Sequence, residues 1–328
     1  MLFLDCQDVA NLLPMADCIE AVARAFAAHA DAALPVAPGV LGSQVGDGGF
    51  HVKTAALDAS PGYFAAKVNA NFPDNPARRG LPTIQGVIAL FDTEAGRPLA
   101  LLDSMEITTL RTAAASAVAA RYLAQPDAAT LLICGCGNQG RAHLRALMQV
   151  RRLARVLAHD RDPGRMQSFI RENSAECGID ILPAANLPES FPLCDIGVTC
   201  TPACEILIRA GDIRPGQFIA AVGADSQGKQ ELDPQVLAGS LVVADIAGQA
   251  AEMGELQHAI AAKLMKIGDL HAELGQLVTG RRPGRSSARQ VFVFDSTGTA
   301  LQDVAAAAAV YERAVAAGQG RRLSLDGA

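Results

Sequence analysis

Apolar residues near the N-terminus follow first a helical and then a strand-like spacing. Residues 19–27 carry apolar side chains three and four positions apart, which predicts an amphipathic helix. Short β-like runs, broken by Gly and Pro, follow at 50–57, 63–69 and 85–92. Consecutive strands without intervening helices favour an antiparallel or mixed sheet in this part of the chain.

From residue 107 onward the pattern changes to regular alternation of helices and buried strands. An Ala-rich stretch at 107–123 predicts one long helix. Apolar segments that predict buried strands then recur, at 130–134, 155–158, 196–200, 218–222, 241–244 and 292–294. This alternation is typical of a doubly wound parallel sheet.

The two patterns predict an α/β protein with two domains. A final helix over 300–316 is expected to return to the first domain, which makes that domain discontinuous. We therefore expect a substrate-binding and dimerisation domain of α+β type at 1–120 plus 300–328. A Rossmann dinucleotide-binding domain is expected at 121–299.

Composition excludes several classes of protein. The 328 residues suffice for two domains, and 28 basic against 34 acidic side chains give a net charge of −6, which argues against a nucleic-acid partner. No apolar run of membrane-spanning length occurs, so no membrane association is expected. The first residues lack a basic region, which favours a cytoplasmic protein without a signal peptide. The eight cysteines have neither zinc nor thiol-redox spacing, so no metal site is expected.

A Gly-rich turn carries the clearest chemistry. The strand at 130–134 runs into Gly135-Cys136-Gly137-Asn138-Gln139-Gly140, and an apolar helix follows. The glycines permit a tight turn and a close approach of the backbone to a pyrophosphate, and the helix start offers unpaired N–H groups. We predict that this turn binds a nicotinamide dinucleotide.

Asp160 lies twenty positions after the last glycine of the turn, at the end of the next strand. A carboxylate at this position binds the adenosine ribose and repels a 2′-phosphate, which favours NAD(H). Arg161 keeps NADP(H) open, because an adjacent guanidinium can bind a 2′-phosphate or stack on adenine.

Several ordered segments together resemble the ornithine cyclodeaminase/mu-crystallin family over nearly the whole chain. They are Lys67–Asn69, Gly80–Thr83, Thr108–Ala114, Val222–Asp225, Gly228–Asp233, Phe294–Gly298 and Gln302–Ala305. The resemblance implies a homodimer that binds NAD(H) or NADP(H) and a small amino or imino acid.

For three residues, the resemblance and the chemistry of such a substrate indicate a role at the substrate. Arg111 offers a bidentate fork to a carboxylate, and Lys67 is a cation in an otherwise apolar strand. Asp225 follows the strand at 218–222 at its carboxyl end, and the resemblance implies that it contacts the substrate nitrogen. A structural ion pair, a snorkelling lysine and a turn residue remain the simpler interpretations of these three residues.

The resemblance also implies further contacts. Thr112, Thr199 and Thr201 are expected to touch the phosphates or riboses of the coenzyme, and Ser296 is expected to line the substrate pocket. Lys53 is the natural replacement for an arginine that cyclodeaminases of the family carry upstream of the lysine. His51 stands near the place of a glutamate that holds the second amine of ornithine.

These departures decide the expected reaction. The imidazole of His51 would bind the second ammonium group of ornithine poorly. A ketimine reductase acts on a ring that is already closed, so it needs no residue that binds this group. We therefore predict reduction of Δ1-pyrroline-2-carboxylate or Δ1-piperideine-2-carboxylate to the L-amino acid. An ornithine or lysine cyclodeaminase, a linear amino-acid dehydrogenase such as alanine dehydrogenase, and a non-enzymatic mu-crystallin-like protein remain the alternatives.

Overall fold

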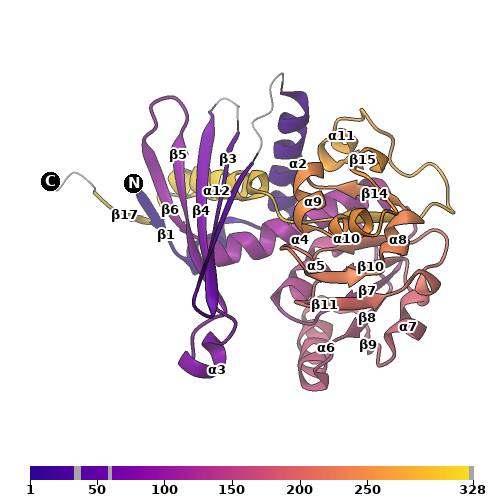
Figure 1. Ribbon diagram of the computed structural model, residues 1–328. Coiled ribbons are helices and arrows are strands. Elements are labelled where there is room, and N and C mark those ends of the chain that lie inside the picture. The colour runs from indigo at the N-terminus through magenta and orange to yellow at the C-terminus, as the bar shows by residue number, and fades with distance from the viewer. Residues whose placement is uncertain (33–37, 58–60, 325–328) are drawn as a thin grey trace. The chain divides into compact units, whose positions relative to one another are not determined.

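The computed structural model describes residues 1–32, 38–57 and 61–324. Contacts divide the chain into two compact units (Figure 1). The first consists of Met1–Arg111 together with Thr299–Ala328, and the second is Thr112–Gly298. Both the N-terminal segment and the last helix thus belong to the first unit, and the second unit is continuous in sequence.

A seven-stranded mixed sheet forms the centre of the first unit. Neighbouring strands are antiparallel except β1 and β6, which run parallel. In spatial order the strands are β17 (Arg321–Arg322), β1 (Leu2–Leu4), β6 (Pro98–Asp103), β5 (Ile84–Asp92), β4 (Tyr63–Asn71), β3 (Gly48–Leu57) and β2 (Gly39–Val45).

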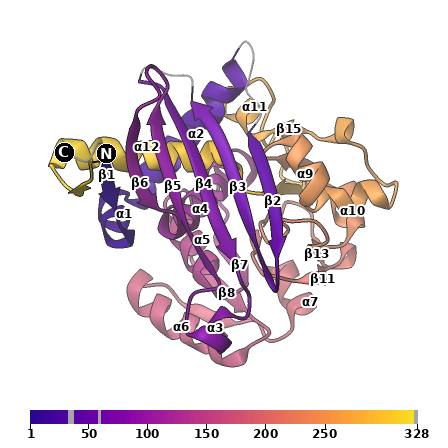
Figure 2. The ribbon, with the colours of Figure 1, turned by 60° about the vertical axis from the view of Figure 1, so that its left-hand side comes forward.

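Helices cover one face of this sheet. The helices of the unit are α1 (Cys6–Leu12), α2 (Met15–Asp31), α3 (Asn75–Arg79), the start of α4 (Ser104–Leu123) and α12 (Ala300–Ala317). Helix α12 packs against α2 and against β3 and β4, and Figure 2 shows it crossing behind the strands. Alanines dominate α12, and these small side chains allow the helix to approach the sheet closely.

The opposite face of the sheet is apolar and exposed. Leu41, Val52, Val68 and Val87 stand directly opposite one another on neighbouring strands. Leu41 is 66% exposed, and Val68 and Val87 are 38% and 41% exposed. We call this row, together with Phe50, the outer sheet face.

An eight-stranded parallel sheet forms the centre of the second unit. In spatial order its strands are β15 (Ala272–Glu273), β14 (Leu241–Ala244), β16 (Phe292–Asp295), β12 (Phe218–Ala221), β10 (Ile196–Thr199), β7 (Thr130–Cys134), β8 (Arg155–His159) and β9 (Ile181–Pro183). The strand order reverses between β7 and β10, and open α/β sheets place their ligand sites at such a point. A separate two-stranded parallel sheet joins β11 (Cys204–Ile208) and β13 (Gln230–Leu232).

Helices connect these parallel strands. They are α5 (Asn138–Met148), α6 (Pro163–Cys177), α7 (Leu187–Ser190), α8 (Pro234–Ala238), α9 (Ala247–Met253), α10 (Leu256–Ala261) and α11 (Leu274–Val278), with 3₁₀ turns at Phe191–Leu193, Ala210–Asp212 and Ile267–Asp269. Side chains of Leu132 on β7, Ile219 on β12 and Val293 on β16 are fully buried in one core cluster with Phe191. The predicted α/β class with a parallel Rossmann-type sheet and a separate mixed-sheet domain is confirmed.

Several element boundaries differ from the sequence-based expectation. Strands β2 and β6 were not predicted, and helix α4 begins at Ser104, before the expected start at 107. The early start has a local cause, since the Asp103 carboxylate accepts hydrogen bonds from the amides of Met105 and Glu106. Among the described residues, the helices are all too short or too polar to cross a membrane.

Candidate functional site

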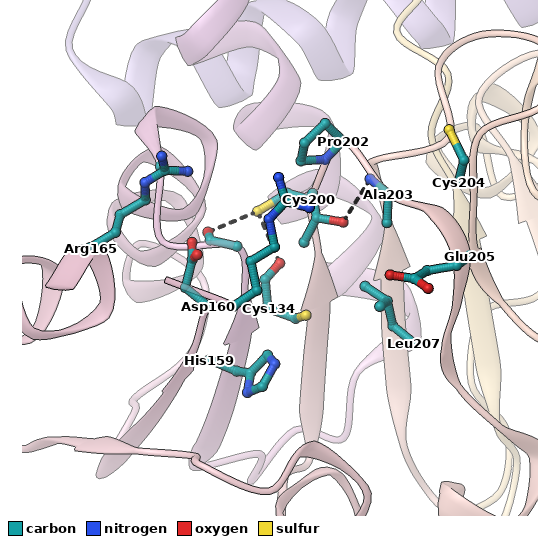
Figure 3. A pocket seen from close by; sticks show the side chains of 14 residues that line it. Cys134, His159, Asp160, Arg165, Cys200, Pro202, Ala203, Cys204, Glu205 and Leu207 are labelled. Atoms are coloured by element: carbon teal, nitrogen blue, oxygen red, sulfur yellow. Dashed lines mark hydrogen bonds between the residues drawn. The ribbon is translucent and has the colours of Figure 1, made fainter. Parts of the chain in front are cut away.

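A pocket of about 480 Å³ opens at the carboxyl edge of the parallel sheet in the second unit. Its walls come from the ends of β7, β8 and β10 and from β11. Asp160 and Arg165 lie on one side of the pocket, and Cys204, Glu205 and Leu207 lie on the other (Figure 3). The pocket therefore stands where the strand order reverses, and its volume is typical of a small-ligand site.

The Gly-rich turn shapes the floor of this pocket. Gly135 has a φ of +110°, which side chains rarely adopt, and a Cβ there would lie 2.9 Å from the Cys200 carbonyl oxygen. A Cβ on Gly140 would lie 2.2 Å from the Gly135 carbonyl oxygen. Gly137 lines the pocket and has open space at its Cβ position. This cradle fits a dinucleotide, because the backbone stays open to a pyrophosphate just before the start of α5.

The other residues of the turn belong to α5. Asn138 and Gln139 are its first two residues, and Asn138 is exposed whereas Gln139 is half-buried. The buried His143 imidazole lies between the Gln139 carbonyl and the Ser116 hydroxyl, at 2.8 and 3.0 Å. Burial lowers the pKa of His143 to about 4, so the ring is neutral and holds α5 against α4.

Asp160 lies in the pocket beside two arginines. Its carboxylate accepts hydrogen bonds from the amides of Cys136 and Asp162, both at 2.9 Å. Arg161 and Arg165 line the same pocket. Arg165 was not among the residues selected from the sequence, because it lies in the first turn of α6 and no motif points to it.

The three predicted coenzyme threonines differ in position. Thr201 lines the pocket, but its hydroxyl donates to the Glu231 carboxylate at 2.7 Å and accepts the Ala203 amide at 3.2 Å. Thr199 is fully buried beside the same carboxylate, and Thr112 is buried at the start of the second unit. The threonine hydroxyls at 199 and 201 thus face Glu231.

Ser296 and Asp225 also belong to the second unit. Ser296 follows β16 and is 1% exposed, and its hydroxyl makes no hydrogen bond to any described residue. The Asp225 carboxylate is half exposed and forms an ion pair with Lys229 at 2.6 Å. Neither side chain lines the pocket at the glycine turn.

A buried charge cluster lies in the first unit between the sheet and α12. The Lys67 ammonium on β4 lies 2.8 and 2.7 Å from the two carboxylate oxygens of Asp303, and it donates to the Thr108 hydroxyl at 3.3 Å. Arg111 Nε lies 2.9 Å from the same carboxylate, and Arg111 Nη1 donates to the Gln302 side-chain oxygen. Lys67, Arg111 and Asp303 are 3%, 4% and 1% exposed. Two cations therefore share one carboxylate out of contact with bulk water.

The pKa values within this cluster follow from burial and mutual charge. Burial, helped by the Arg111 charge, lowers the pKa of Lys67 from 10.5 to about 7, although Asp303 opposes the shift. For Asp303, burial alone would raise the pKa, but Arg111 and Lys67 outweigh burial and hold it below its ordinary value. The carboxylate is therefore ionised at neutral pH, whereas the lysine exchanges its proton near neutrality.

Lys53 and His51 lie on β3, which is adjacent to β4. Lys53 stands directly opposite Lys67, and its charge also acts on Lys67 and Asp303. His51 stands opposite Asn69 and is exposed. Lys53 thus lies beside Lys67 on the neighbouring strand, and His51 lies two residues before Lys53 on β3.

Asp303 and Gln302 are the two members of the charge cluster's contacts on α12 that the sequence analysis did not select. Both lie in a segment already recognised as part of the resemblance. An acidic residue in the first turn of a helix is ordinarily explained by the helix dipole, so it gave no separate signal. Pairing with Lys67 is visible only once β4 and α12 are packed together.

Comparison with known proteins gives one consistent answer. The model of the ornithine cyclodeaminase/mu-crystallin family matches residues 1–318. A solved structure of an archaeal alanine dehydrogenase dimer with bound NAD superposes with a TM-score of 0.93 at 33% identity and covers 99% of both chains. The Δ1-pyrroline-2-carboxylate reductase of Thermococcus litoralis, solved with NADH and L-proline, gives a TM-score of 0.92 at 32% identity and covers 98% of this chain and 100% of that one.

Curated sequences agree with the solved structures. The iminosuccinate reductase of Paracoccus denitrificans is 35% identical over 317 residues, which cover 96% of this chain and 97% of that protein. The family match spans most of the chain and includes all the motifs listed in the sequence, so the predicted resemblance is confirmed. The chain belongs to the ornithine cyclodeaminase/mu-crystallin family.

Proposed function

We propose that this protein reduces a cyclic 2-imino acid, Δ1-pyrroline-2-carboxylate or Δ1-piperideine-2-carboxylate, to the L-amino acid, with NADH as its preferred coenzyme. The broader class is an NAD(P)-dependent oxidoreductase of amino or imino acids, as the family and its named relatives indicate. The observation that carries the proposal of a carboxylate-bearing substrate and a proton donor for its nitrogen is the buried cluster of Lys67, Arg111 and Asp303.

The charges of the cluster favour a substrate carboxylate. With Lys67 protonated, two buried cations face one carboxylate, so one positive charge is not balanced within the cluster. A substrate carboxylate supplies the missing negative charge, and the planar Arg111 guanidinium suits it. Lys53, opposite Lys67, is proposed as a second carboxylate contact. His51 and Ser296 are proposed to line the site further from the carboxylate.

The protonation of Lys67 suits reduction of a carbon–nitrogen double bond. A bound dihydronicotinamide supplies the hydride, and the substrate nitrogen must hold one more proton in the product than in the neutral imine. A lysine with a pKa of about 7 can release that proton at neutral pH, and Asp303 orients its ammonium. Asp225 is proposed as a second group that contacts the nitrogen.

The choice of coenzyme rests on the pocket of the second unit. Gly135, Gly137 and Gly140 leave room for the pyrophosphate, and Asn138, Gln139 and Thr112 are proposed to contact it. Asp160 favours an unphosphorylated ribose because its carboxylate would repel a 2′-phosphate. Two relatives were solved with NAD or NADH, which supports the same choice. Arg161 and Arg165 make NADPH the coenzyme to test beside NADH.

A linear amino-acid dehydrogenase is the second candidate. The archaeal alanine dehydrogenase covers 99% of the chain, and a carboxylate contact with a proton donor suits a 2-oxo acid and ammonia as well. A cyclodeaminase would in addition release ammonia from ornithine or lysine. The three reactions differ in their requirement for ammonia, so one assay panel separates them.

The first test measures oxidation of NADH and NADPH at 340 nm. The substrates are the two cyclic imino acids, pyruvate with ammonium, and oxaloacetate with ammonium, and ammonia release from ornithine is assayed in parallel. Lys67→Met preserves much of the side-chain volume but removes the charge, and kcat/KM for the imino acid should fall at least about 100-fold. Lys266→Met is the matched control, because Lys266 is 81% exposed and belongs to the second unit.

The outcomes separate the candidates. Turnover of a cyclic imino acid without ammonium, lost in Lys67→Met and kept in Lys266→Met, supports the reductase. Turnover only with ammonium and a linear oxo acid would instead identify the protein as a linear amino-acid dehydrogenase. Ammonia release from ornithine without net coenzyme consumption would instead identify it as a cyclodeaminase. NADH binding without any of these reactions would favour the mu-crystallin-like alternative.

A further inference from the structure

A fully buried glutamate joins two loops at the coenzyme edge of the parallel sheet. One Glu231 carboxylate oxygen accepts both the amide and the hydroxyl of Thr201 at 2.7 Å. The other accepts the Gly223 amide at 2.9 Å. Thr201 follows β10 and lines the pocket, and Gly223 lies two residues before Asp225. One carboxylate therefore binds both the loop that follows β10 and contains Thr201, which we call the coenzyme loop, and the loop that carries Asp225.

The fit around this carboxylate is close. Glu231 is 0% exposed, and a Cβ on Gly223 would lie 2.4 Å from its carboxylate. The Asp225 amide in turn donates to the Gly223 carbonyl at 3.1 Å, so the position of Gly223 fixes the start of the Asp225 turn. Because the carboxylate is dehydrated, each lost hydrogen bond leaves a buried donor unpaired.

The glutamate itself is anchored by two more buried carboxyl groups. Glu255 accepts the amides of Glu231 and Leu232 at 2.7 and 3.2 Å. Asp295, at the end of β16, accepts the amides of Glu255 and Leu256 at 3.0 and 2.9 Å. The three acids thus form a series in which each carboxyl group accepts hydrogen bonds from the backbone of the next segment. Glu231 is the member of the series that binds the loops after β10 and β12.

We propose that Glu231 is a positioning residue for catalysis, which sets the Gly223–Asp225 turn relative to the coenzyme loop at Thr201. It touches neither substrate nor coenzyme and acts through the backbone of both loops. The inference rests on the proposed function for the role of Asp225. Its geometric part, the coupling of two loops by one carboxylate, rests on the second unit alone.

Glu231→Gln provides an asymmetric test. A side-chain amide has one acceptor oxygen, whereas the carboxylate meets three donors in two directions. With its oxygen toward Thr201, the amide keeps two hydrogen bonds and turns an NH₂ donor toward the Gly223 amide. The variant should therefore retain the hydrogen bonds to Thr201 in the coenzyme loop and lose the hydrogen bond to Gly223 in the Asp225 turn.

The expected result is a kinetic split. kcat should fall about 10- to 100-fold, because a displacement of about 1 Å in a reacting group has this effect. The dissociation constant of NADH, followed by its fluorescence, should change less than about threefold. Hydrogen exchange should become faster in peptides that cover residues 222–226.

Asp195→Asn is the matched control. Asp195 also accepts two backbone amides, those of Ala129 and Thr130 at 2.9 Å, and it pairs with Arg214. It precedes β10 and so lies at the amino edge of the same sheet, away from the pocket. This variant should lose thermal stability while keeping kcat, NADH affinity and exchange at 222–226 unchanged.

Two results would overturn the inference. One is unchanged exchange at 222–226 in Glu231→Gln, and the other is a loss of kcat no greater than that of Asp195→Asn. If the wild-type protein turns over none of the substrates, the proposed function fails, and exchange at 222–226 still decides whether Glu231 holds the turn.

Discussion

Lys67 is a buried cation whose protonation changes in the physiological pH range. Its pKa of about 7 lies below the ordinary 10.5, so its protonated fraction falls as the pH rises through 7. If Lys67 supplies the proton, kcat/KM for imine reduction should fall up to about tenfold per pH unit above 7. Lys67→Arg stays charged throughout, so this limb of the pH profile should disappear in the variant. Retention of the limb in Lys67→Arg would assign it to another group.

The same shift predicts how stability depends on pH. Between pH 7 and 10.5 the unfolded chain binds the Lys67 proton more tightly than the folded chain does. The unfolded state therefore holds more protons, and this group makes the protein more stable as the pH rises across that window. Urea unfolding at pH 7 and pH 9 should show the gain in wild type, and the gain should be smaller in Lys67→Met.

Asp303 compensates two buried cations, so its loss should be costly. Asp303→Asn is expected to lower the free energy of unfolding by about 3–5 kcal/mol, since Arg111 would remain buried without a counterion and Lys67 would lose the partner that favours its charged form. Asp17→Asn is the matched control, because Asp17 pairs with Arg313 at the surface of the same unit. That exposed pair should contribute about 0–1 kcal/mol in urea unfolding. Equal effects of the two substitutions would contradict the role of Asp303.

At the scale of elements, the turn between β7 and α5 uses two glycines for different reasons. Gly140→Ala places a Cβ 2.2 Å from the Gly135 carbonyl oxygen, so α5 must move and stability should fall by about 1–3 kcal/mol. Gly137→Ala meets no protein atom within 4 Å and should fold normally, but its methyl group would face the pyrophosphate and weaken NADH binding. Calorimetry and NADH fluorescence check the two effects. Gly248→Ala, in open space on α9, is the neutral control.

The sequence predicted elements wherever local pattern and burial agree. The central strands β7, β10, β12 and β16 are buried on both faces and are continuous apolar runs, so they were found. Strand β2 is exposed at every position and contains two glycines, so it carries no alternation to detect. Strand β6 begins at a proline directly after a turn, which favours an irregular segment in a local reading.

The prediction of site residues from the sequence was also limited to what the local pattern shows. Lys67 and Arg111 were selected because charges in apolar segments need a reason, and both lie in one buried cluster. Asp303 and Glu231 were missed, since each looks ordinary among its neighbours in sequence. Their partners lie 236 and 30 residues away, and only the packed fold brings them into contact. The Asp225 carboxylate pairs with Lys229, four residues later in the chain. The contact of Asp225 with the substrate nitrogen therefore stays a prediction.

For the whole molecule, the outer sheet face predicts a homodimer. Leu41, Phe50, Val68 and Val87 expose apolar surface on neighbouring strands, and a relative was solved as a dimer. Val68→Asp should shift the mass found by analytical ultracentrifugation toward the monomer, because burying two symmetry-related carboxylates is unfavourable. Val315→Asp is the control, because Val315 is 56% exposed and lies on α12, outside this face. An unchanged dimer in Val68→Asp would place the interface elsewhere.

The position of α12 in the sequence has a consequence for biosynthesis. The ribosome makes Lys67 and Arg111 early, then the whole of Thr112–Gly298, and only afterwards the helix that carries Asp303. Because a continuous domain can fold as a unit during synthesis, the dinucleotide-binding unit can be complete while the first unit still lacks its counterion. A nascent chain arrested before Thr299 should therefore bind NADH on the ribosome and yet leave the mixed sheet of the first unit open to proteolysis. Asp303 can pair with Lys67 and Arg111 only after α12 emerges, so coenzyme binding is expected to precede completion of the charge cluster.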